Sequence, residues 1–243
     1  DFRAAFFIIM EFQCKTFSLN HSLCSMKVGS DSILLSCLSP EDINPKKILD
    51  IGCGSGIISL CMAQNYSTSS IIGIDIDKMS IYQAKDNFEK SRYSERLSAI
   101  LIDFNEFADN RNEEFDLIIT NPPYFVNSLL PEKEQKLRAR HTLSLSFEDL
   151  CKGVSKLLSQ KGIFALIIPY TNHKDFIQIT QKEGLFSRAQ YNIIPREGKE
   201  PNRVIFHFSK QENPDFIIKE IALRDKENNP NKEYITLTKK YLL

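Results

Sequence analysis

The chain has 243 residues, and its 31 lysines and arginines balance its 31 aspartates and glutamates. A chain of this length can bury a sizeable core in one domain, and no apolar run reaches the roughly 18 residues that a membrane-spanning helix needs. The six cysteines are scattered without a C-x-x-C pair and the four histidines lack metal-ligand spacing, which argues against a disulfide framework and a metal site and favours a reduced, cytoplasmic protein.

Strand and helix patterns alternate between Lys47 and about Lys210, which predicts an α/β fold with a doubly wound, mostly parallel sheet. Strands are expected near 47–51, 71–75, 97–102, 115–120 and 163–168. Helices are expected near 31–38, 56–65, 78–91, 146–158 and 172–183. Two apolar segments near 186–195 and 202–209 would form a hairpin that contributes one antiparallel strand, and a strand near 215–223 and a short helix near 231–241 follow.

The organisation predicted from this pattern is a single domain over residues 1–243. Residues 1–11 are expected to be a leader outside the core, and residues 12–46 form a segment ahead of the first core strand. Residues 47–210 would form the core, and residues 211–243 would add the last strand and helix.

Charge is distributed unevenly, although its sum is zero. Residues 1–120 contain 11 lysines and arginines against 17 aspartates and glutamates, whereas residues 121–243 contain 20 against 14. The excess of positive charge in the second half indicates a polyanionic partner such as RNA. Solvated helix faces without any partner are the alternative explanation of the same excess.

A glycine-rich turn connects the first core strand to its helix. Gly52, Gly54 and Gly56 alternate with other residues after Asp50. Glycines let a backbone approach a ligand closely, and the helix N-terminus supplies free N–H groups. A NAD-binding turn requires its third glycine three residues after the second, and Ile57 stands in that place. The spacing therefore disfavours a nicotinamide-dependent dehydrogenase.

Polar side chains end the successive strands. Asp75 closes the strand near 71–75, about 20 residues after the glycine turn, where nucleotide-binding folds hold a ribose diol. Asp103 closes the strand near 97–102. Because the C-terminal ends of parallel strands share one edge of a sheet, Asp50, Asp75, Asp103 and Asn121 are predicted to lie together at a ligand site.

The segment Asn121-Pro122-Pro123-Tyr124 follows the apolar strand near 115–120. Two prolines cannot extend a strand, because each lacks an N–H group and fixes φ at about −65°. The Asn121 side chain and the Pro122 carbonyl can accept hydrogen bonds from a flat, amine-bearing group while Tyr124 stacks on its ring face. Phe125 is either a second receiving ring or an ordinary core residue.

These motifs resemble those of a known enzyme class. The glycine turn is similar to the S-adenosylmethionine loop of class I methyltransferases. The Asn-Pro-Pro-Tyr motif resembles the signature of members that methylate planar nitrogens, mainly adenine N6 and a glutamine side-chain amide. Residues 25–35 resemble the Met-Lys-Val-Gly-Thr-Asp-Gly segment of one family, the bacterial tRNA(Val) adenine-N6 methyltransferases.

The resemblance to this family extends from about Phe12 over nearly the whole chain. It includes Arg140 before a Thr-Leu-Ser segment, the loop with Pro201 and Arg203, and the C-terminal segment 234–242. The glycine turn points only to the class and the Asn-Pro-Pro-Tyr motif to the reaction. The segment 25–35 and the C-terminal segment point to the family.

The resemblance implies the class I methyltransferase fold, S-adenosylmethionine as cofactor, and methylation of the N6 amine of an adenine in the anticodon loop of tRNA(Val), 3′ of the anticodon. Residues 12–46 would cover the cofactor. The implied enzyme is a cytoplasmic monomer that binds tRNA but no membrane and no metal ion. It would use Asn121, Pro122 and Tyr124 for catalysis; Lys27, Gly29, Ser30, Asp31, Asp50, Gly52, Gly54, Gly56, Asp75, Asp103 and Asn121 for the cofactor; and Pro123, Phe125, Arg138, Arg140, Lys199 and Arg203 for the substrate.

Several positions leave alternatives open. Ser30 keeps the hydroxyl of the family's threonine, but Ser30 or Asp31 could instead cap a helix over 31–38. Ser32 replaces the family's glycine, so the resemblance assigns it no role. The polar stretch 131–140 is either a segment that orders on RNA or a surface loop without a partner.

Two other activities are compatible with the motifs. A protein methyltransferase acting on a glutamine amide uses the same Asn-Pro-Pro-Tyr geometry, and a non-catalytic RNA-binding protein can retain the fold. The basic second half favours RNA over a protein substrate. The intact glycine turn and Asn-Pro-Pro-Tyr motif favour an enzyme over a non-catalytic binder.

Overall fold

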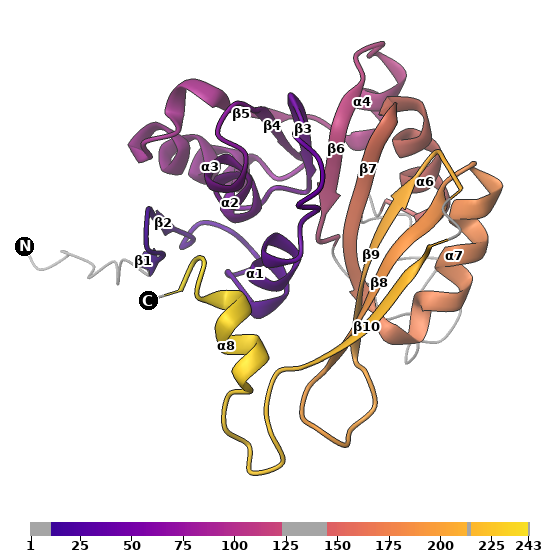
Figure 1. Cartoon of the computed structure of the whole chain (residues 1–243). Helices are drawn as coiled ribbons and strands as arrows, with labels where there is room; N and C mark the ends of the chain where they lie inside the picture. The colour runs from indigo at the N-terminus through magenta and orange to yellow at the C-terminus, as the bar shows by residue number, and fades with distance from the viewer. Residues whose placement is uncertain (1–10, 123–144, 213–214, 243) are drawn as a thin grey trace, which may run out of the picture.

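The computed structural model describes residues 11–122, 145–212 and 215–242. Within these residues eight strands form one sheet in the order β10-β8-β9-β7-β6-β3-β4-β5 (Figure 1). Strand β9 is antiparallel to both neighbours, and every other pair is parallel. The strands are β3 (Lys47–Ile51), β4 (Ser70–Asp75), β5 (Leu97–Leu101), β6 (Phe115–Thr120), β7 (Leu158–Pro169), β8 (Phe186–Ile194), β9 (Arg203–Ser209) and β10 (Ile217–Ala222).

Helices cover both faces of this sheet, as the alternating pattern predicts. One apolar cluster joins the sheet to α1 (Ser30–Cys37), α2 (Ile57–Asn65), α3 (Lys78–Lys90) and α8 (Lys232–Thr238). A second cluster on the opposite face joins it to α4 (Phe104–Asp109), α6 (Phe147–Leu157) and α7 (His173–Lys182). The predicted doubly wound α/β fold with one antiparallel strand is therefore confirmed.

Three features differ from the sequence-based expectation. A two-stranded sheet of β1 (Glu11–Gln13) and β2 (Ser18–Asn20) precedes α1, and the short helix α4 follows β5. Strand β7 begins at Leu158 rather than at Ile163. Residues 159–162 are polar or glycine and lack an apolar alternation, but α6 leads directly into the strand and Leu158 pairs with Phe115 of β6. Backbone pairing outweighs the local pattern there.

The first and last parts of the chain meet beside the sheet. Helices α1 and α8 pack together on one face (Figure 1), and the Tyr241 hydroxyl donates a hydrogen bond of 3.1 Å to the Ser36 carbonyl. Tyr241 is fully buried. The C-terminal segment therefore fixes α1, which lies next to the C-terminal ends of the central strands. No helix in the described ranges is long and apolar enough to cross a membrane.

Gly56 has a packing role at the start of α2. Its φ is +84°, a left-handed conformation that favours glycine. A Cβ atom there would stand 2.3 Å from Cε1 of the Phe88 ring. Since Phe88 belongs to α3, the absence of a side chain at Gly56 lets α2 and α3 pack closely.

We expect Gly56→Ala to lower the free energy of unfolding through two costs, about 1–2 kcal/mol for the left-handed backbone and about 1–3 kcal/mol for the clash with Phe88. Gly184→Ala is the matched control, because Gly184 has φ +71° but a Cβ there meets nothing within 4 Å. Urea denaturation of both variants measures the difference. Equal losses of stability would show that the contact with Phe88 contributes nothing.

Candidate active site

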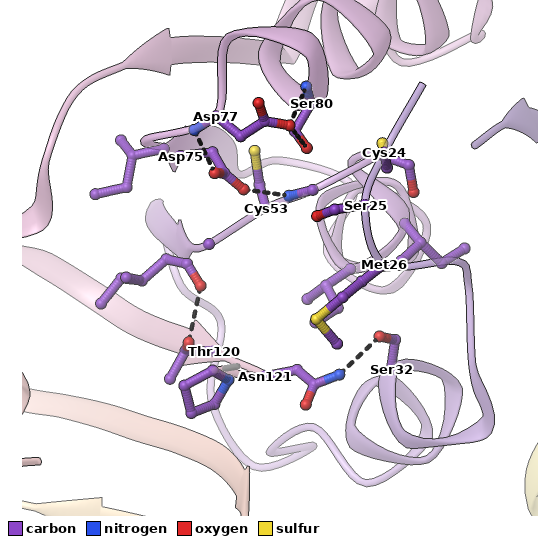
Figure 2. Close-up of a pocket in the computed structure, with 18 of the residues that line it drawn as sticks. Cys24, Ser25, Met26, Ser32, Cys53, Asp75, Asp77, Ser80, Thr120 and Asn121 are labelled. Atoms are coloured by element: carbon purple, nitrogen blue, oxygen red, sulfur yellow. Dashed lines mark hydrogen bonds between the residues drawn. The ribbon is translucent and has the colours of Figure 1, made fainter. Parts of the chain in front are cut away.

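A cavity of about 610 Å³ opens at the C-terminal ends of β3, β4 and β6. Residues 24–32 form one wall, and the glycine turn after β3 forms the opposite wall (Figure 2). Of the residues expected at the site, the cavity is lined by Lys27, Gly29, Ser30, Asp31, Gly52, Gly54, Asp75, Asp103, Asn121, Pro122 and Arg203.

The register of three parallel strands brings the motifs together. Ile51 of β3 pairs with Ile74 of β4 on one side and with Thr120 of β6 on the other. The next residues, Gly52, Asp75 and Asn121, therefore lie at one level at this edge of the sheet, and all line the cavity. This is the arrangement expected from their positions at the strand ends.

The glycine turn is held by backbone hydrogen bonds. The N–H groups of Gly52 and Cys53 donate to the Ile74 carbonyl at 2.8 and 2.9 Å. Gly52 and Gly54 have φ of +70° and +54°, and a Cβ at either would meet no atom within 4 Å. Their backbone therefore borders open cavity that a ligand can approach. Gly56 does not line the cavity. A Cβ atom at this position would clash with Phe88, so the glycine is required for packing rather than for contact with a ligand.

The Asp75 carboxylate is oriented by two backbone groups. Its Oδ2 accepts from the Gly54 N–H and its Oδ1 accepts from the Asp77 N–H, both at 2.9 Å (Figure 2). Asp103 instead caps α4, and both of its bonds, from the N–H groups of Asn105 and Glu106, fall on Oδ1. Both carboxylates keep acceptor capacity for a polar ligand in the cavity.

Asp50 lies behind the glycine turn and does not line the cavity. Its Oδ2 accepts from the Ser59 N–H at 3.0 Å and from the Ser59 hydroxyl at 2.6 Å. Its Oδ1 is buried without a hydrogen-bond partner among the described residues. Burial raises the pKa of Asp50 to about 7, although the bonds from Ser59 oppose this shift. A buried oxygen without a partner beside an open turn fits a cationic or hydrogen-bond-donating ligand.

Lys27 holds the wall formed by residues 24–32. Its ammonium group donates to the carbonyls of His21, Ser22 and Cys24 at 3.1, 3.0 and 3.1 Å. An ammonium group has three hydrogens, so these bonds occupy its donors. Lys27 therefore shapes the cavity by ordering its own loop, a role that the sequence did not indicate.

Arg203, which was expected to bind the substrate, lines the cavity itself. It starts β9, and its Nε lies 2.9 Å from Oδ2 of Asp31 in α1. The N-cap of α1 is Gly29, and no side chain caps the helix. The alternative that Ser30 or Asp31 caps this helix is therefore wrong, and Asp31 pairs with Arg203. Lys199 lies exposed in the loop between β8 and β9 and does not line the cavity.

The end of β6 is fixed on two sides. The Thr120 hydroxyl donates to the Ile51 carbonyl at 2.8 Å, which ties β6 to β3. The Asn121 Nδ2 donates to the Ser32 hydroxyl at 3.1 Å (Figure 2). Nothing in the sequence pointed to a role for Ser32, which was noted only because it replaces the family's glycine. The predicted site residues Pro123, Tyr124, Phe125, Arg138 and Arg140, and the stretch 131–140, lie outside the described residues.

The cysteines and histidines form no metal site in the part of the chain that the structure describes, where no three His, Cys, Asp or Glu side chains could hold an ion. All six cysteines are free and buried. Desolvation raises the pKa of the Cys53 thiol well above its usual range, although Cys53 lines the cavity. The thiols therefore behave as core side chains rather than as nucleophiles.

Solved structures share this architecture. A predicted O-methyltransferase from Agrobacterium tumefaciens matches with a TM-score of 0.66 at 18% identity, over 86% of this chain and 96% of that chain. The ribosomal protein L11 methylase from Lactobacillus delbrueckii subsp. bulgaricus matches with a TM-score of 0.55 at 16% identity, over 79% of this chain and 83% of that chain. These likenesses concern the fold alone.

Sequence comparisons identify the family. The model of the methyltransferase small domain matches residues 21–142, about half of the chain. A curated protein of Bacteroides fragilis (strain YCH46), named tRNA1(Val) (adenine(37)-N6)-methyltransferase, is 36% identical over 96% of this chain and 97% of its own length. A protein of Photorhabdus laumondii with the same name is 33% identical over 96% of this chain and 95% of its own length. The chain therefore belongs to this family of class I methyltransferases, enzymes whose methyl donor is S-adenosylmethionine.

Proposed function

We propose that this protein methylates the exocyclic N6 amine of an adenine in the anticodon loop of tRNA(Val), the adenine 3′ of the anticodon. The observation that carries the proposal is the placement of Asn121 and Pro122 in the wall of the cavity. They follow β6, which pairs directly with β3, the strand that leads into the glycine turn. The relatives named for methylation of adenine 37 match nearly the whole chain. The enzyme would work as a cytoplasmic monomer.

The cavity has the polar groups that S-adenosylmethionine requires. The cofactor supplies an electrophilic methyl group on a cationic sulfonium. In this proposal Asp75 holds the ribose hydroxyls, Asp103 meets the adenine, and the backbone at Gly52 and Gly54 accommodates the methionine part. Asp50 lies behind the turn, and its buried Oδ1, which has no hydrogen-bond partner among the described residues, favours the cationic ligand. The wall that contains Gly29, Ser30 and Asp31, ordered by Lys27, closes the cofactor from the other side.

Asn121 and Pro122 would activate the amine without a dedicated base. The lone pair of an exocyclic adenine amine is delocalised into the ring, which makes it a weak nucleophile. If Asn121 Oδ1 and the Pro122 carbonyl accept its two hydrogens, the nitrogen becomes more tetrahedral and its lone pair can point at the methyl group. Transfer is then an in-line displacement that positioning and fixed dipoles accelerate. The proton leaves to solvent once the nitrogen carries the fourth bond.

The basic second half of the chain supplies the surface for tRNA. Lys199 stands in the loop between β8 and β9, at the edge of the sheet where the cavity opens. Arg138 and Arg140 would add charge near the target base, and Tyr124, with Pro123 and Phe125, would receive it. An adenine in a loop is unstacked at lower cost than one in a duplex. Arg203, paired with Asp31, would connect this surface to the cofactor wall.

The experiment that tests the proposal uses methyl-labelled S-adenosylmethionine and two tRNA(Val) transcripts. We expect label in N6-methyladenosine with the natural transcript and none when the adenine 3′ of the anticodon is replaced by guanine. Digestion and nucleoside chromatography provide the measurement. Label in a release-factor glutamine, with none in either transcript, would overturn the proposal in favour of protein methylation.

The Asp75→Ala variant should bind the demethylated cofactor product at least about tenfold more weakly, because a charge-assisted hydrogen bond to the ribose is lost. Asp86→Ala is the control, since Asp86 carries the same charge on α3 but pairs with Lys90 at the surface. Titration calorimetry measures both affinities. Equal affinities for the two variants would contradict the placement of the ribose at Asp75.

Replacing the motif side chains should separate cofactor binding from chemistry. Asn121→Ala is expected to lower the rate of methyl transfer by roughly 10²-fold or more while cofactor affinity stays nearly unchanged, as when an oriented transition-state group is removed. Tyr124→Phe should keep much of the activity that Tyr124→Ala loses, because stacking needs the ring alone. Single-turnover rates measure these effects, and a Tyr124→Phe variant as slow as Tyr124→Ala would implicate the phenol in the reaction.

A further inference from the structure

The side chain of Asn121 is held by a residue far away in the chain. Its Nδ2 donates a hydrogen bond of 3.1 Å to Oγ of Ser32, which lies 89 positions earlier, in the first turn of α1 (Figure 2). Ser32 is only 8% exposed, so water competes weakly for this bond. The contact joins the segment before the core to the Asn-Pro-Pro-Tyr motif.

The direction of this bond matters because an asparagine amide has two nearly isosteric orientations. One presents Oδ1, an acceptor, and the other presents an NH₂ group, a donor. An exocyclic amine offers its own hydrogens, so only the first orientation can receive them. A hydroxyl can accept or donate; in this structure the Ser32 hydroxyl accepts from Nδ2, and Oδ1 is the other polar atom of the amide group.

We infer that Ser32 is a positioning residue for the methyl transfer: its hydroxyl, which accepts from Nδ2, holds the Asn121 side chain in the position from which Oδ1 can accept a hydrogen of the target amine. This inference rests on the proposed function, in which Asn121 accepts a hydrogen from the amine. It adds a role for a residue that neither the motif nor the glycine turn contains.

Both ends of the bond are fixed by the fold. On the Ser32 side, the Ser36 carbonyl of α1 accepts hydrogen bonds from the Tyr241 hydroxyl at 3.1 Å and from Asn65 Nδ2 at 3.2 Å. Arg203 holds the first turn of the same helix through Asp31. On the Asn121 side, the preceding Thr120 is bonded to the backbone of β3. The donor and acceptor therefore meet without further movement, as an oriented catalytic group requires.

The acceptor of this bond is the side-chain oxygen of Ser32. In the segment that residues 25–35 resemble, glycine stands at the position of Ser32, and glycine offers no side-chain oxygen. Ser32→Gly and Ser32→Ala both remove the acceptor. The loss of methyl-transfer rate in these variants should be smaller than in Asn121→Ala, because the Asn121 amide can still reach its productive position for part of the time.

The test compares single-turnover methyl transfer to tRNA(Val) in Ser32→Ala, Ser32→Thr and Ser36→Ala variants, with and without Asn121→Ala. We expect Ser32→Ala to lower the rate constant of transfer at saturating tRNA by roughly 3- to 10-fold, the fold-change that loss of one neutral hydrogen bond produces, with the tRNA concentration for half-maximal rate unchanged. Ser32→Thr keeps the hydroxyl and should restore the rate. Ser36→Ala removes a buried hydroxyl from the same helix, which donates to the Ser32 carbonyl and not to the Asn121 side chain, and should leave the rate near that of the unaltered protein.

The double variant decides between positioning and structure. In the Asn121→Ala background, Ser32→Ala should cause no further loss of rate, because the side-chain amide that Ser32 holds in place is already absent. An equal loss in both backgrounds, or a loss matched by Ser36→Ala, would overturn the inference even if the threonine variant does not fold. Full activity of Asn121→Ala would instead overturn the proposed role of Asn121, so the two failures are distinguishable.

Discussion

Parallel pairing of β3 with β4 and β6 is the constraint on which the site depends. Each strand is followed or ended by a cavity-lining residue at the same level only because Ile51 is level with both Ile74 and Thr120. Displacement of either neighbour by one residue would turn every side chain of that strand to the other face of the sheet. The hydrogen bond from Thr120 to the Ile51 carbonyl and those from the glycine turn to the Ile74 carbonyl hold this alignment at the edge itself.

The segment before the core completes the site that the sheet begins. Lys27 orders its loop, Asp31 pairs with Arg203 of β9, and Ser32 bonds Asn121 of β6. Helix α1 is in turn fixed by the buried Tyr241 near the C-terminus. The cavity wall is therefore tied to the sheet, to Asn121 after β6 and to the C-terminal segment.

Site residues at strand ends were predictable, whereas their partners were not. Asp75, Asp103 and Asn121 follow apolar runs, so strand alternation and the prolines after Asn121 locate them. Gly56 was assigned to the cofactor because the glycine turn resembles the S-adenosylmethionine loop, but its position is explained by the Phe88 ring 32 residues later. Arg203 was expected on a substrate-facing rim, and its pairing with Asp31 depends on the antiparallel placement of β9, which local sequence does not specify.

The sequence by itself determined the alternation of strands and helices, the glycine turn, the polar strand ends and the family to which the chain belongs, because these depend on residues close together in the chain. Only the tertiary structure decided that Ser32 bonds Asn121, that Lys27 is engaged by three carbonyls, and that Asp50 is buried behind the turn with one oxygen that no described residue contacts by a hydrogen bond. Each of these depends on the distance and orientation of groups far apart in the chain, which packing of α1 and α2 against the sheet sets and which no local pattern encodes.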